Sequence, residues 1–247
     1  MKQFALIGNK LGHSWSQLWF NDLFTRLGLE DYHYFLHETE SLDNLKKWVN
    51  DNNISGFNVT IPYKQQIIPL LDTLSPEAAS IGAVNCVCVK NGRLIGHNTD
   101  APAFNETFCN VRANLDNRTS KNDPASSAII LGTGGAAQAV GYALDKLNTE
   151  HLFVSRHPIG KSISYDEAAK LPPHYNILVN ATPVGMWPKV NACPWQASLE
   201  RFAIVYDLIY NPSPTLLLRK AAESGAIVTD GLAMLHRQAE LSWQLWQ

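Results

Sequence analysis

The chain has 247 residues, of which 45% are hydrophobic and 17% are charged, and its formal net charge at pH 7 is −2. This length suits one large domain or two modest ones, each with an ordinary hydrophobic core. The small net charge gives no electrostatic case for nucleic acid or for an anionic membrane as a partner. The first residues begin a strand without a signal-peptide pattern, and no apolar run is long enough to span a bilayer, so we expect a cytoplasmic protein.

The four cysteines are Cys86, Cys88, Cys109 and Cys193, and their spacing is not that of metal ligands. The sequence therefore predicts no metal site. Cys86 and Cys88 alternate along a predicted strand, so their side chains should point to one face of a sheet. Reduced thiols are typical of the cytoplasm, which agrees with the expected location.

The first hundred residues alternate between strand and helix patterns. Short apolar runs predict strands over 4–7, 32–36 and 56–60, while helical spacing predicts a helix capped by Ser16 and ended by Gly28, and another over 42–49. Pro62 is placed where proline suits the start of a helix. The pair Asn91–Gly92 predicts a hairpin between strands over 83–89 and 93–96. A helix is expected to begin near Asp100.

The second half begins with a polar segment over 114–127 that contains Pro124 and predicts a surface connection. Strands are predicted over 129–131, 152–154, 176–180, 204–208 and 226–229, and the longer ones are continuously apolar, as a parallel sheet covered on both faces requires. Helices are predicted over 215–224 and 232–246. The order of elements indicates an α/β protein of two domains, and a ligand cleft is expected between them.

A glycine turn, Gly132–Thr133–Gly134–Gly135–Ala136, follows a short apolar strand and precedes a helical pattern. This order is typical of a dinucleotide-binding unit, in which a pyrophosphate lies against backbone N–H groups at a helix N-terminus. Gly132 permits the tight turn, and Gly134 lets the phosphates approach the backbone. The flanking strand and helix make the motif more specific than glycines alone.

The end of the next strand, Ser155–Arg156–His157, indicates which dinucleotide binds. An acidic residue there would bind the ribose 2′-hydroxyl of NAD, whereas arginine suits the 2′-phosphate of NADP. Arg156 can form two hydrogen bonds with a phosphate and can stack on adenine. A solvated surface cation is the alternative, and the glycine turn upstream favours NADP.

Four polar clusters of the first half, at 8–16, 58–64, 82–85 and 97–100, lie at strand ends or helix starts, where ligand sites gather. Ser14 and Ser16 at a helix N-terminus suit a carboxylate, although helix capping explains one of them. Lys64 and Asp100 in one site would make a proton donor kept charged by its neighbour. The alternatives are a surface lysine and an aspartate that caps a helix.

In order and spacing these clusters, with four later ones, resemble the motifs of the shikimate dehydrogenase family over nearly the whole chain. The earlier motifs are Gly-Asn-x-x-x-His-Ser-x-Ser at 8–16, Asn-Val-Thr-x-Pro-x-Lys at 58–64, Gly-Ala-Val-Asn at 82–85 and Asn-Thr-Asp at 98–100. The later ones are Gly-Thr-Gly-Gly-Ala at 132–136, Asn-Ala-Thr-Pro-x-Gly-Met at 180–186, Tyr-Asn-Pro-x-x-Thr at 210–215 and Asp-Gly-Leu-x-Met-Leu-x-x-Gln-Ala at 230–239. Each alone is weak, but eight in order are specific.

The resemblance implies an NADP-dependent oxidoreductase that reversibly reduces 3-dehydroshikimate to shikimate in aromatic amino acid biosynthesis. It implies a substrate-binding domain over 1–101, completed by 231–247, and a Rossmann-type NADP-binding domain over 102–230. Lys64, paired with Asp100, would be the catalytic acid and base. The implied substrate-binding residues are Ser14, Ser16, Thr60, Asn85, Asp100, Tyr210 and Gln238. The implied cofactor-binding residues are Gly132, Thr133, Gly134, Gly135, Ala136, Ser155, Arg156, Met186, Leu208 and Gly231.

Three other functions are alternatives to this one. A quinate/shikimate dehydrogenase that uses NAD fits the motifs, but Arg156 argues against NAD. A non-catalytic sensor of the same metabolites would not need Lys64 and Asp100, and both are present. A reductase of another small ketone would require the first-domain motifs to be accidental. The oligomeric state stays open, and a homodimer is one state that the sequence allows.

Overall fold

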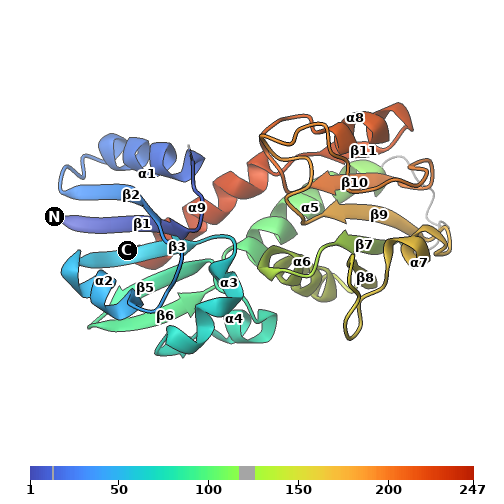
Figure 1. Cartoon of the computed structure of the whole chain (residues 1–247). Coiled ribbons are helices and arrows are strands. Elements are labelled where there is room, and N and C mark those ends of the chain that lie inside the picture. The colour runs from blue at the N-terminus through green and yellow to red at the C-terminus, as the bar shows by residue number, and fades with distance from the viewer. Residues whose placement is uncertain (13, 117–125) are drawn as a thin grey trace. The chain divides into compact units, whose positions relative to one another are not determined.

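The computed structural model describes residues 1–12, 14–116 and 126–247. They form two compact units, the first made of 1–99 and 238–247 and the second of 100–237. The chain therefore enters the second unit once and returns to the first at its C-terminal end. Figure 1 labels the elements of each unit.

The first unit is built on a six-stranded sheet with the order β2-β1-β3-β5-β6-β4 (Figure 1). The three strands β1, β2 and β3 are parallel, whereas β5 is antiparallel to both β3 and β6. The strands are β1 (Lys2–Gly8), β2 (Tyr32–Glu38), β3 (Ile54–Val59), β4 (Thr73–Leu74), β5 (Cys86–Lys90) and β6 (Arg93–His97). The helices are α1 (Trp15–Arg26), α2 (Leu45–Asp51), α3 (Tyr63–Gln66), the 3₁₀ turn η1 (Ile68–Leu70) and α4 (Pro76–Ile81).

The C-terminal helix α9 (Leu232–Trp246) supplies part of the core of the first unit. The ring of Trp246 lies 5.0 Å from that of Phe4 and 5.2 Å from that of Phe20, and its Nε1 donates to the Val87 carbonyl at 3.0 Å. A Cβ at Gly56 would lie 2.5 Å from the same Nε1, so only glycine leaves room for the indole. The last residues of the chain are thus packed into the unit that its first residues begin.

The second unit is a five-stranded parallel sheet with the order β11-β10-β9-β7-β8. Its central strands are almost wholly buried, as their continuous apolar sequences predict. The strands are β7 (Ser127–Leu131), β8 (His151–Val154), β9 (Tyr175–Asn180), β10 (Ile204–Asp207) and β11 (Ile227–Thr229). The helices are α5 (Asp100–Asp116), α6 (Gly135–Lys146), α7 (Tyr165–Ala169), α8 (Leu216–Glu223) and the first part of α9.

The hairpin and the cysteine face are confirmed. Asn91 and Gly92 have φ angles of 54° and 73°, the left-handed pair that a two-residue hairpin turn with the strand twist requires. Cys86 and Cys88 are both buried in one hydrophobic cluster on the same face of the sheet. The last helix also has the predicted bounds.

Several predicted boundaries are wrong for local reasons. Ser14, not Ser16, caps α1, because its Oγ accepts a hydrogen bond from the Ser16 N–H. The strand predicted over 83–89 begins only at Cys86, since the chain first leaves the unpredicted helix α4 through Gly82 at φ 69°. Within the predicted connection over 114–127, α5 continues to Asp116 and Ser127 already belongs to β7. Residues 117–125, with Pro124, lie outside the described residues.

Replacing Trp246 by alanine should lower the free energy of unfolding by about 3–5 kcal/mol, as other buried Trp→Ala changes do. The variant loses the indole packing and the bond to the Val87 carbonyl. Urea denaturation followed by circular dichroism measures the change. Trp187→Ala is the matched control, because that side chain is 66% exposed, and its expected cost is below about 0.5 kcal/mol. Equal losses in the two variants would contradict this account of the core.

Candidate functional site

The polar clusters of the first unit meet at one edge of its sheet. Because β1, β2 and β3 are parallel, all three end at this edge. Since β5 is antiparallel to β3, it starts there, and β6 returns to end there. The segments after Gly8, Val59 and His97, and the one before Cys86, are therefore neighbours although they are far apart in sequence.

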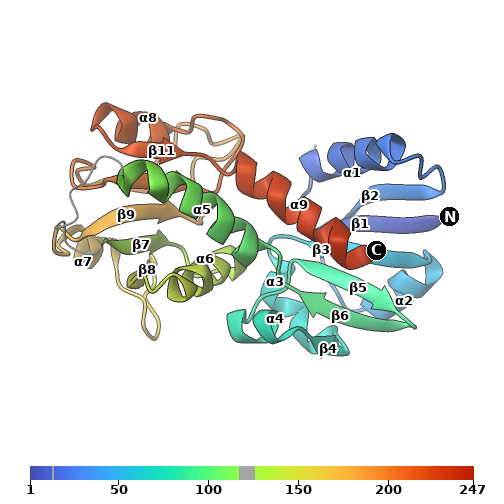
Figure 2. The ribbon, with the colours of Figure 1, turned by 180° about the vertical axis from the view of Figure 1, so that it is seen from behind.

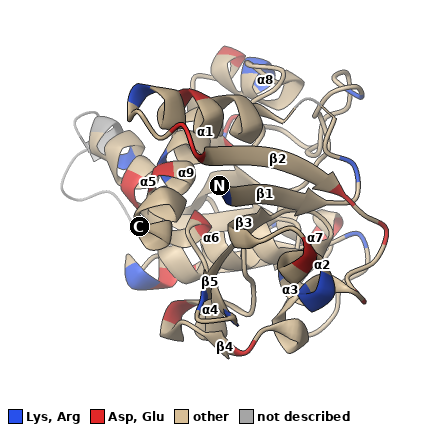
Figure 3. Cartoon of the chain, turned by 90° about the vertical axis from the view of Figure 1, so that its left-hand side faces the viewer, with Lys and Arg blue, Asp and Glu red and all other residues tan. Residues whose placement is uncertain are grey.

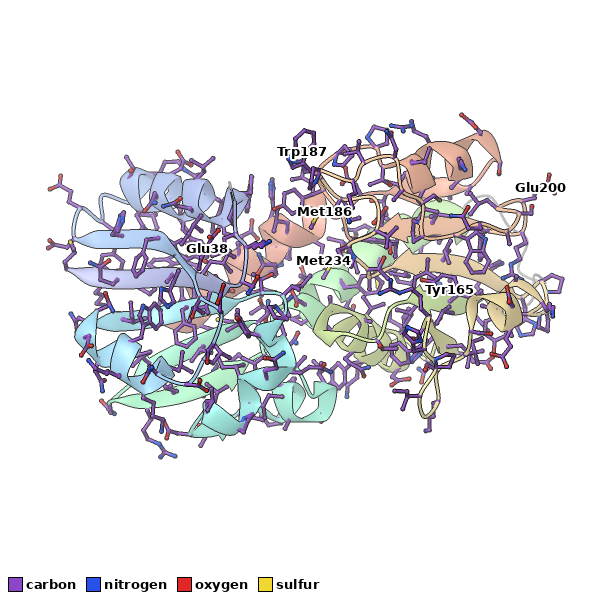
Figure 4. The ribbon with its side chains drawn as sticks, viewed as in Figure 1. Glu38, Tyr165, Met186, Trp187, Glu200 and Met234 are labelled. Carbon is purple, nitrogen blue, oxygen red and sulfur yellow. The ribbon has the colours of Figure 1, made fainter. Side chains whose placement is uncertain are left out.

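The two serines follow β1 in a loop that Glu38 holds in place. The Glu38 carboxylate, at the end of β2 and labelled in Figure 4, accepts the N–H groups of Leu11 at 2.7 Å and Gly12 at 3.1 Å. These two bonds lower the pKa of Glu38. Ser14 then caps α1 and Ser16, 7% exposed, lies in its first turn. His13 of the same motif lies outside the described residues.

Thr60 and Lys64 follow β3 and are tied to the neighbouring clusters through their backbones. The Thr60 N–H donates to the Ile7 carbonyl at 2.9 Å, at the end of β1. Lys64 is half-buried in the short helix α3, and its carbonyl accepts the Val84 N–H at 2.7 Å. The motif at 58–64 is thus bonded to the motif at 82–85.

Asn85 connects this edge to the last helix. The side chain is 2% exposed, and its Oδ1 accepts the Thr99 N–H at 2.7 Å. Its Nδ2 donates to Thr99 Oγ1 at 2.9 Å and to Gln238 Oε1 at 3.4 Å. Three predicted site segments of the first unit are therefore joined by direct hydrogen bonds. Asn58, which opens the cluster at 58–64 but was assigned no role of its own, donates its Nδ2 to the Asn85 carbonyl at 3.2 Å.

Asp100 begins α5 in the second unit and is 5% exposed. A carboxylate at a helix N-terminus is stabilised by the helix dipole. Asp100 is the first residue of α5, whereas a capping residue would lie one position before the helix.

In the second unit the parallel strands bring five loops to one edge. Gly132, after β7, has a φ of 105°, and a Cβ there would lie 3.2 Å from the Ala181 carbonyl oxygen, so the fold itself requires glycine. Gly134 differs, because its φ of −75° suits any residue and no protein atom lies within 4 Å of a Cβ built there. Gly134 is itself the N-cap of α6 and, as a glycine, offers no side chain to the first N–H groups of that helix. This arrangement fits the phosphates of a dinucleotide.

Arg156 lies at the same edge, after β8. Ser155 Oγ accepts the His157 N–H at 3.2 Å and forms a tight turn, while the Ser155 N–H donates to the Ile163 carbonyl at 2.9 Å. The turn leaves the Arg156 side chain exposed. Burial raises the pKa of Tyr165, labelled in Figure 4, and the positive charge of Arg156 acts in the opposite direction. The guanidinium therefore lies near the start of α7.

A buried carboxylate organises the next two loops of this edge. Asp207 is fully buried and accepts Asn180 Nδ2 at 2.9 Å, the Ile209 N–H at 3.1 Å and Thr215 Oγ1 at 2.7 Å. Asn180 in turn accepts the hydroxyl of Thr182 at 2.7 Å. The loops after β9 and β10 are thereby fixed to each other.

Further predicted residues of this unit lie on or beside these loops: Gly231, Leu208 and Met186 of the cofactor set and Tyr210 of the substrate set. A Cβ at Gly231 would lie 2.0 Å from the Leu208 carbonyl oxygen, so the two backbones are in contact as predicted pocket neighbours should be. Met186 is 42% exposed on the loop after β9 (Figure 4). Tyr210 is half-buried, and burial raises its pKa.

Charge does not by itself mark these sites. Figure 3 shows basic and acidic residues interspersed over the face that it draws. Among the described residues, no group of three or more His, Cys, Asp or Glu side chains could hold a metal ion. In the same part of the chain, no helix is long and apolar enough to cross a membrane.

Comparison with known proteins gives one consistent result. A family model described as "Shikimate dehydrogenase substrate binding domain" matches residues 6–87. A Bacillus cereus protein named "Shikimate dehydrogenase (NADP(+))" is 36% identical over 264 residues, covering 100% of this chain and 93% of the relative. Shikimate dehydrogenase 1 from Peptoclostridium difficile superposes with a TM-score of 0.88 at 35% identity, with 100% and 92% of the chains covered.

Two further solved structures were determined with ligands. The Thermus thermophilus shikimate 5-dehydrogenase, in complex with NADP(H) and shikimate, has a TM-score of 0.82 at 33% identity and covers 100% of this chain and 94% of its own. Quinate dehydrogenase from Corynebacterium glutamicum, in complex with NAD, has a TM-score of 0.83 at 25% identity, with 99% and 93% covered.

The stability of the second unit should depend on pH through Asp207. Burial raises the pKa of this carboxyl to about 6 from an ordinary 3.8, despite three hydrogen bonds that lower it, and the charge of Asp230 adds to the rise. The folded state therefore binds the proton more tightly, and this stabilisation is lost as the pH rises through 6. Relative to Asp207→Asn, the wild-type free energy of unfolding should fall by about 2 kcal/mol between about pH 4 and pH 7.

Urea denaturation at a series of pH values measures this difference. Asp166→Asn, an exposed carboxylate of the same unit, is the control and should keep the wild-type profile. Parallel profiles for the wild type and Asp207→Asn would show that the buried carboxyl titrates normally.

Proposed function

Since this chain belongs to the shikimate dehydrogenase family, we propose that it catalyses the reversible NADPH-dependent reduction of 3-dehydroshikimate to shikimate. One observation carries the proposal: each sheet brings predicted residues together at one edge, polar groups in the first unit and the glycine turn with Arg156 in the second. A protein that only binds a nucleotide would not need the first set, and a metabolite sensor would not need the second.

The substrate is held by the residues at the edge of the first sheet. Ser14 and Ser16, at the N-terminus of α1, suit the carboxylate of shikimate, with Tyr210 assisting. The ring hydroxyls are assigned to Thr60, Asn85, Gln238 and Asp100. The hydrogen bond that joins Asn85 Nδ2 to Gln238 Oε1 supports this assignment, because it holds two of these groups next to each other.

The cofactor is held by the edge of the second sheet. The glycine turn and the first N–H groups of α6 suit the pyrophosphate, and Arg156 with Ser155 suits the 2′-phosphate. Leu208 and Gly231 offer backbone contacts, and Met186 an apolar surface for the nicotinamide. When bound, the nicotinamide supplies or accepts the hydride.

Lys64 is the acid and base of the reaction. Its ammonium Nζ donates a proton to the alkoxide that develops as the C3 carbonyl is reduced, and it takes the proton back in the reverse direction. Asp100 is the proposed carboxylate partner of Lys64. The same positive charge stabilises the oxygen anion before the proton is transferred.

The pathway and the location follow as further proposals. We place the reaction in aromatic amino acid biosynthesis and the enzyme in the cytoplasm. Four free cysteines, two of them buried, support a reducing compartment.

The proposal is tested by initial rates of oxidation of shikimate and quinate with NADP and with NAD. Shikimate with NADP should be the fastest of the four combinations. Turnover of quinate with NAD would assign the chain to the alternative dehydrogenase, and binding without turnover would favour the sensor.

In the same assay, Arg156→Ala should raise the KM for NADP by about tenfold to a hundredfold, since a hydrogen bond to a charged group contributes about 1.5–3 kcal/mol. The KM for NAD and for shikimate should change little. Lys170→Ala, which removes a lysine of the same unit outside the site, is the control. An unchanged preference for NADP would remove Arg156 from the 2′-phosphate site.

Lys64→Ala should lower kcat by about 10²–10⁴-fold, the usual contribution of a positioned acid, with a smaller change in the KM for shikimate. Steady-state kinetics measure both. Lys46→Ala removes a lysine of the same unit whose ammonium pairs with Asp72 at 2.6 Å, and it should keep the wild-type kcat. A Lys64→Ala variant with most of its kcat would refute the assignment.

A further inference from the structure

Ser242, on α9 one helical turn after Gln238, is fully buried and lies outside every motif identified in the sequence. Its Oγ donates to the Gln238 carbonyl at 2.8 Å and accepts Asn58 Nδ2 at 2.9 Å. The same oxygen lies 3.3 Å from Thr99 Oγ1. One hydroxyl thus touches the three segments that carry Thr60, Asp100 and Gln238. Figure 2 shows the C-terminal half of α9 beside the strands of the first unit.

Counting hydrogens fixes the direction of the bonds that Ser242 makes with Gln238 and Thr99. A serine hydroxyl has one hydrogen, and Ser242 gives it to the Gln238 carbonyl. The contact with Thr99 must therefore use the hydrogen of Thr99. It follows that Thr99 Oγ1 is an acceptor toward Asn85 Nδ2, which lies 2.9 Å away.

The direction of that bond orients two predicted substrate-binding amides. With Nδ2 turned to Thr99 Oγ1, Asn85 presents Oδ1 to the Thr99 N–H at 2.7 Å. The second hydrogen of Nδ2 points to Gln238 Oε1 at 3.4 Å. The acceptor end of the Gln238 amide, Oε1, therefore faces Asn85, and Nε2 is its donor end.

The hydrogen bonds that join Tyr34, Asn58 and Ser242 also have one direction each. Tyr34 donates its hydroxyl to Asn58 Oδ1 at 2.9 Å, and Asn58 uses its two amide hydrogens for Ser242 and the Asn85 carbonyl. Burial raises the pKa of Tyr34, so this hydroxyl stays a donor. Five buried polar side chains then have one consistent set of hydrogen positions: Tyr34, Asn58, Asn85, Thr99 and Ser242.

We propose that Ser242 is a positioning residue of the substrate site, which sets through Thr99 the orientation of Asn85 and Gln238 and so presents a hydrogen-bond donor of Gln238 to the substrate. This inference rests on the proposed function. Without the Ser242 oxygen, the hydrogen of the Thr99 hydroxyl has lost its acceptor. When it turns toward Asn85, it meets the hydrogens of Asn85 Nδ2, which need the same oxygen as their acceptor. The Thr99 N–H still holds Asn85 Oδ1, but the bond from Asn85 Nδ2 to Thr99 Oγ1 weakens and the contact from Asn85 to Gln238 loses its alignment.

The test compares Ser242→Ala with the wild type in steady-state oxidation of shikimate. We expect the KM for shikimate to rise about threefold to tenfold, the effect of one hydrogen bond of about 0.5–1.5 kcal/mol. The KM for NADP should stay within about twofold, and kcat should fall less than kcat/KM. In a Gln238→Ala background, Ser242→Ala should change the KM for shikimate by less than about twofold, because the group through which it acts is gone.

Two further variants separate positioning from loss of stability. Ser242→Thr keeps the hydroxyl and should restore the KM for shikimate to within about threefold of the wild type, even if its extra methyl lowers the melting temperature. Trp246→Phe, on the same helix, removes the bond to the Val87 carbonyl and should lower stability without changing that KM.

The outcomes are distinguishable. An active wild type with an unchanged KM in Ser242→Ala, or equal KM changes in Ser242→Ala and Trp246→Phe, overturns the inference and leaves the proposed function in place. Additive effects of Ser242→Ala and Gln238→Ala also overturn it. A wild type that neither turns over nor binds shikimate overturns the proposed function, and the inference with it.

Discussion

Strands that run in the same direction must end at the same edge of a sheet, and both candidate sites of this protein depend on that constraint. In the first unit it brings the ends of β1 and β3 together, and the antiparallel pair β5 and β6 adds two more segments to the same edge. In the second unit all strands obey it. Residues far apart in the sequence thereby become neighbours without any long-range motif.

The edges are made rigid by buried polar groups that satisfy one another. Asp207 accepts three hydrogen bonds and fixes two loops of the second unit, while Asn85 and Asn58 join three segments of the first. An unpaired buried polar group costs about 1–3 kcal/mol, so each network favours one arrangement of its loops. This supports a site whose groups are oriented before the ligand arrives, as efficient catalysis requires.

The space and backbone angles at the glycines show which of them the fold itself requires. Gly231 cannot carry a side chain because the Leu208 carbonyl occupies the space, and Gly132 has a φ of 105° that strains any other residue. Gly134 meets no such atoms and has a φ that any residue adopts, so packing does not explain its glycine, whereas the phosphate site that we propose there would. Packing does not explain Met186 either, because its apolar side chain is exposed on a loop that hydrogen bonds to Asn180 hold in place.

The sequence by itself determined the α/β class, the order of the long elements, the hairpin at Asn91–Gly92 and the family, because hydrophobic period, turn chemistry and motif spacing are local properties. It missed α4 and placed the cap of α1 two residues late, since short helices lack a full apolar period and two nearby serines offer the same cap. Only the tertiary structure decided that Ser242 and Asn58 belong with Asn85. A buried hydrogen bond between residues 58 and 242 joins positions 184 apart, and nothing in the neighbourhood of either residue specifies its partner until the chain has folded.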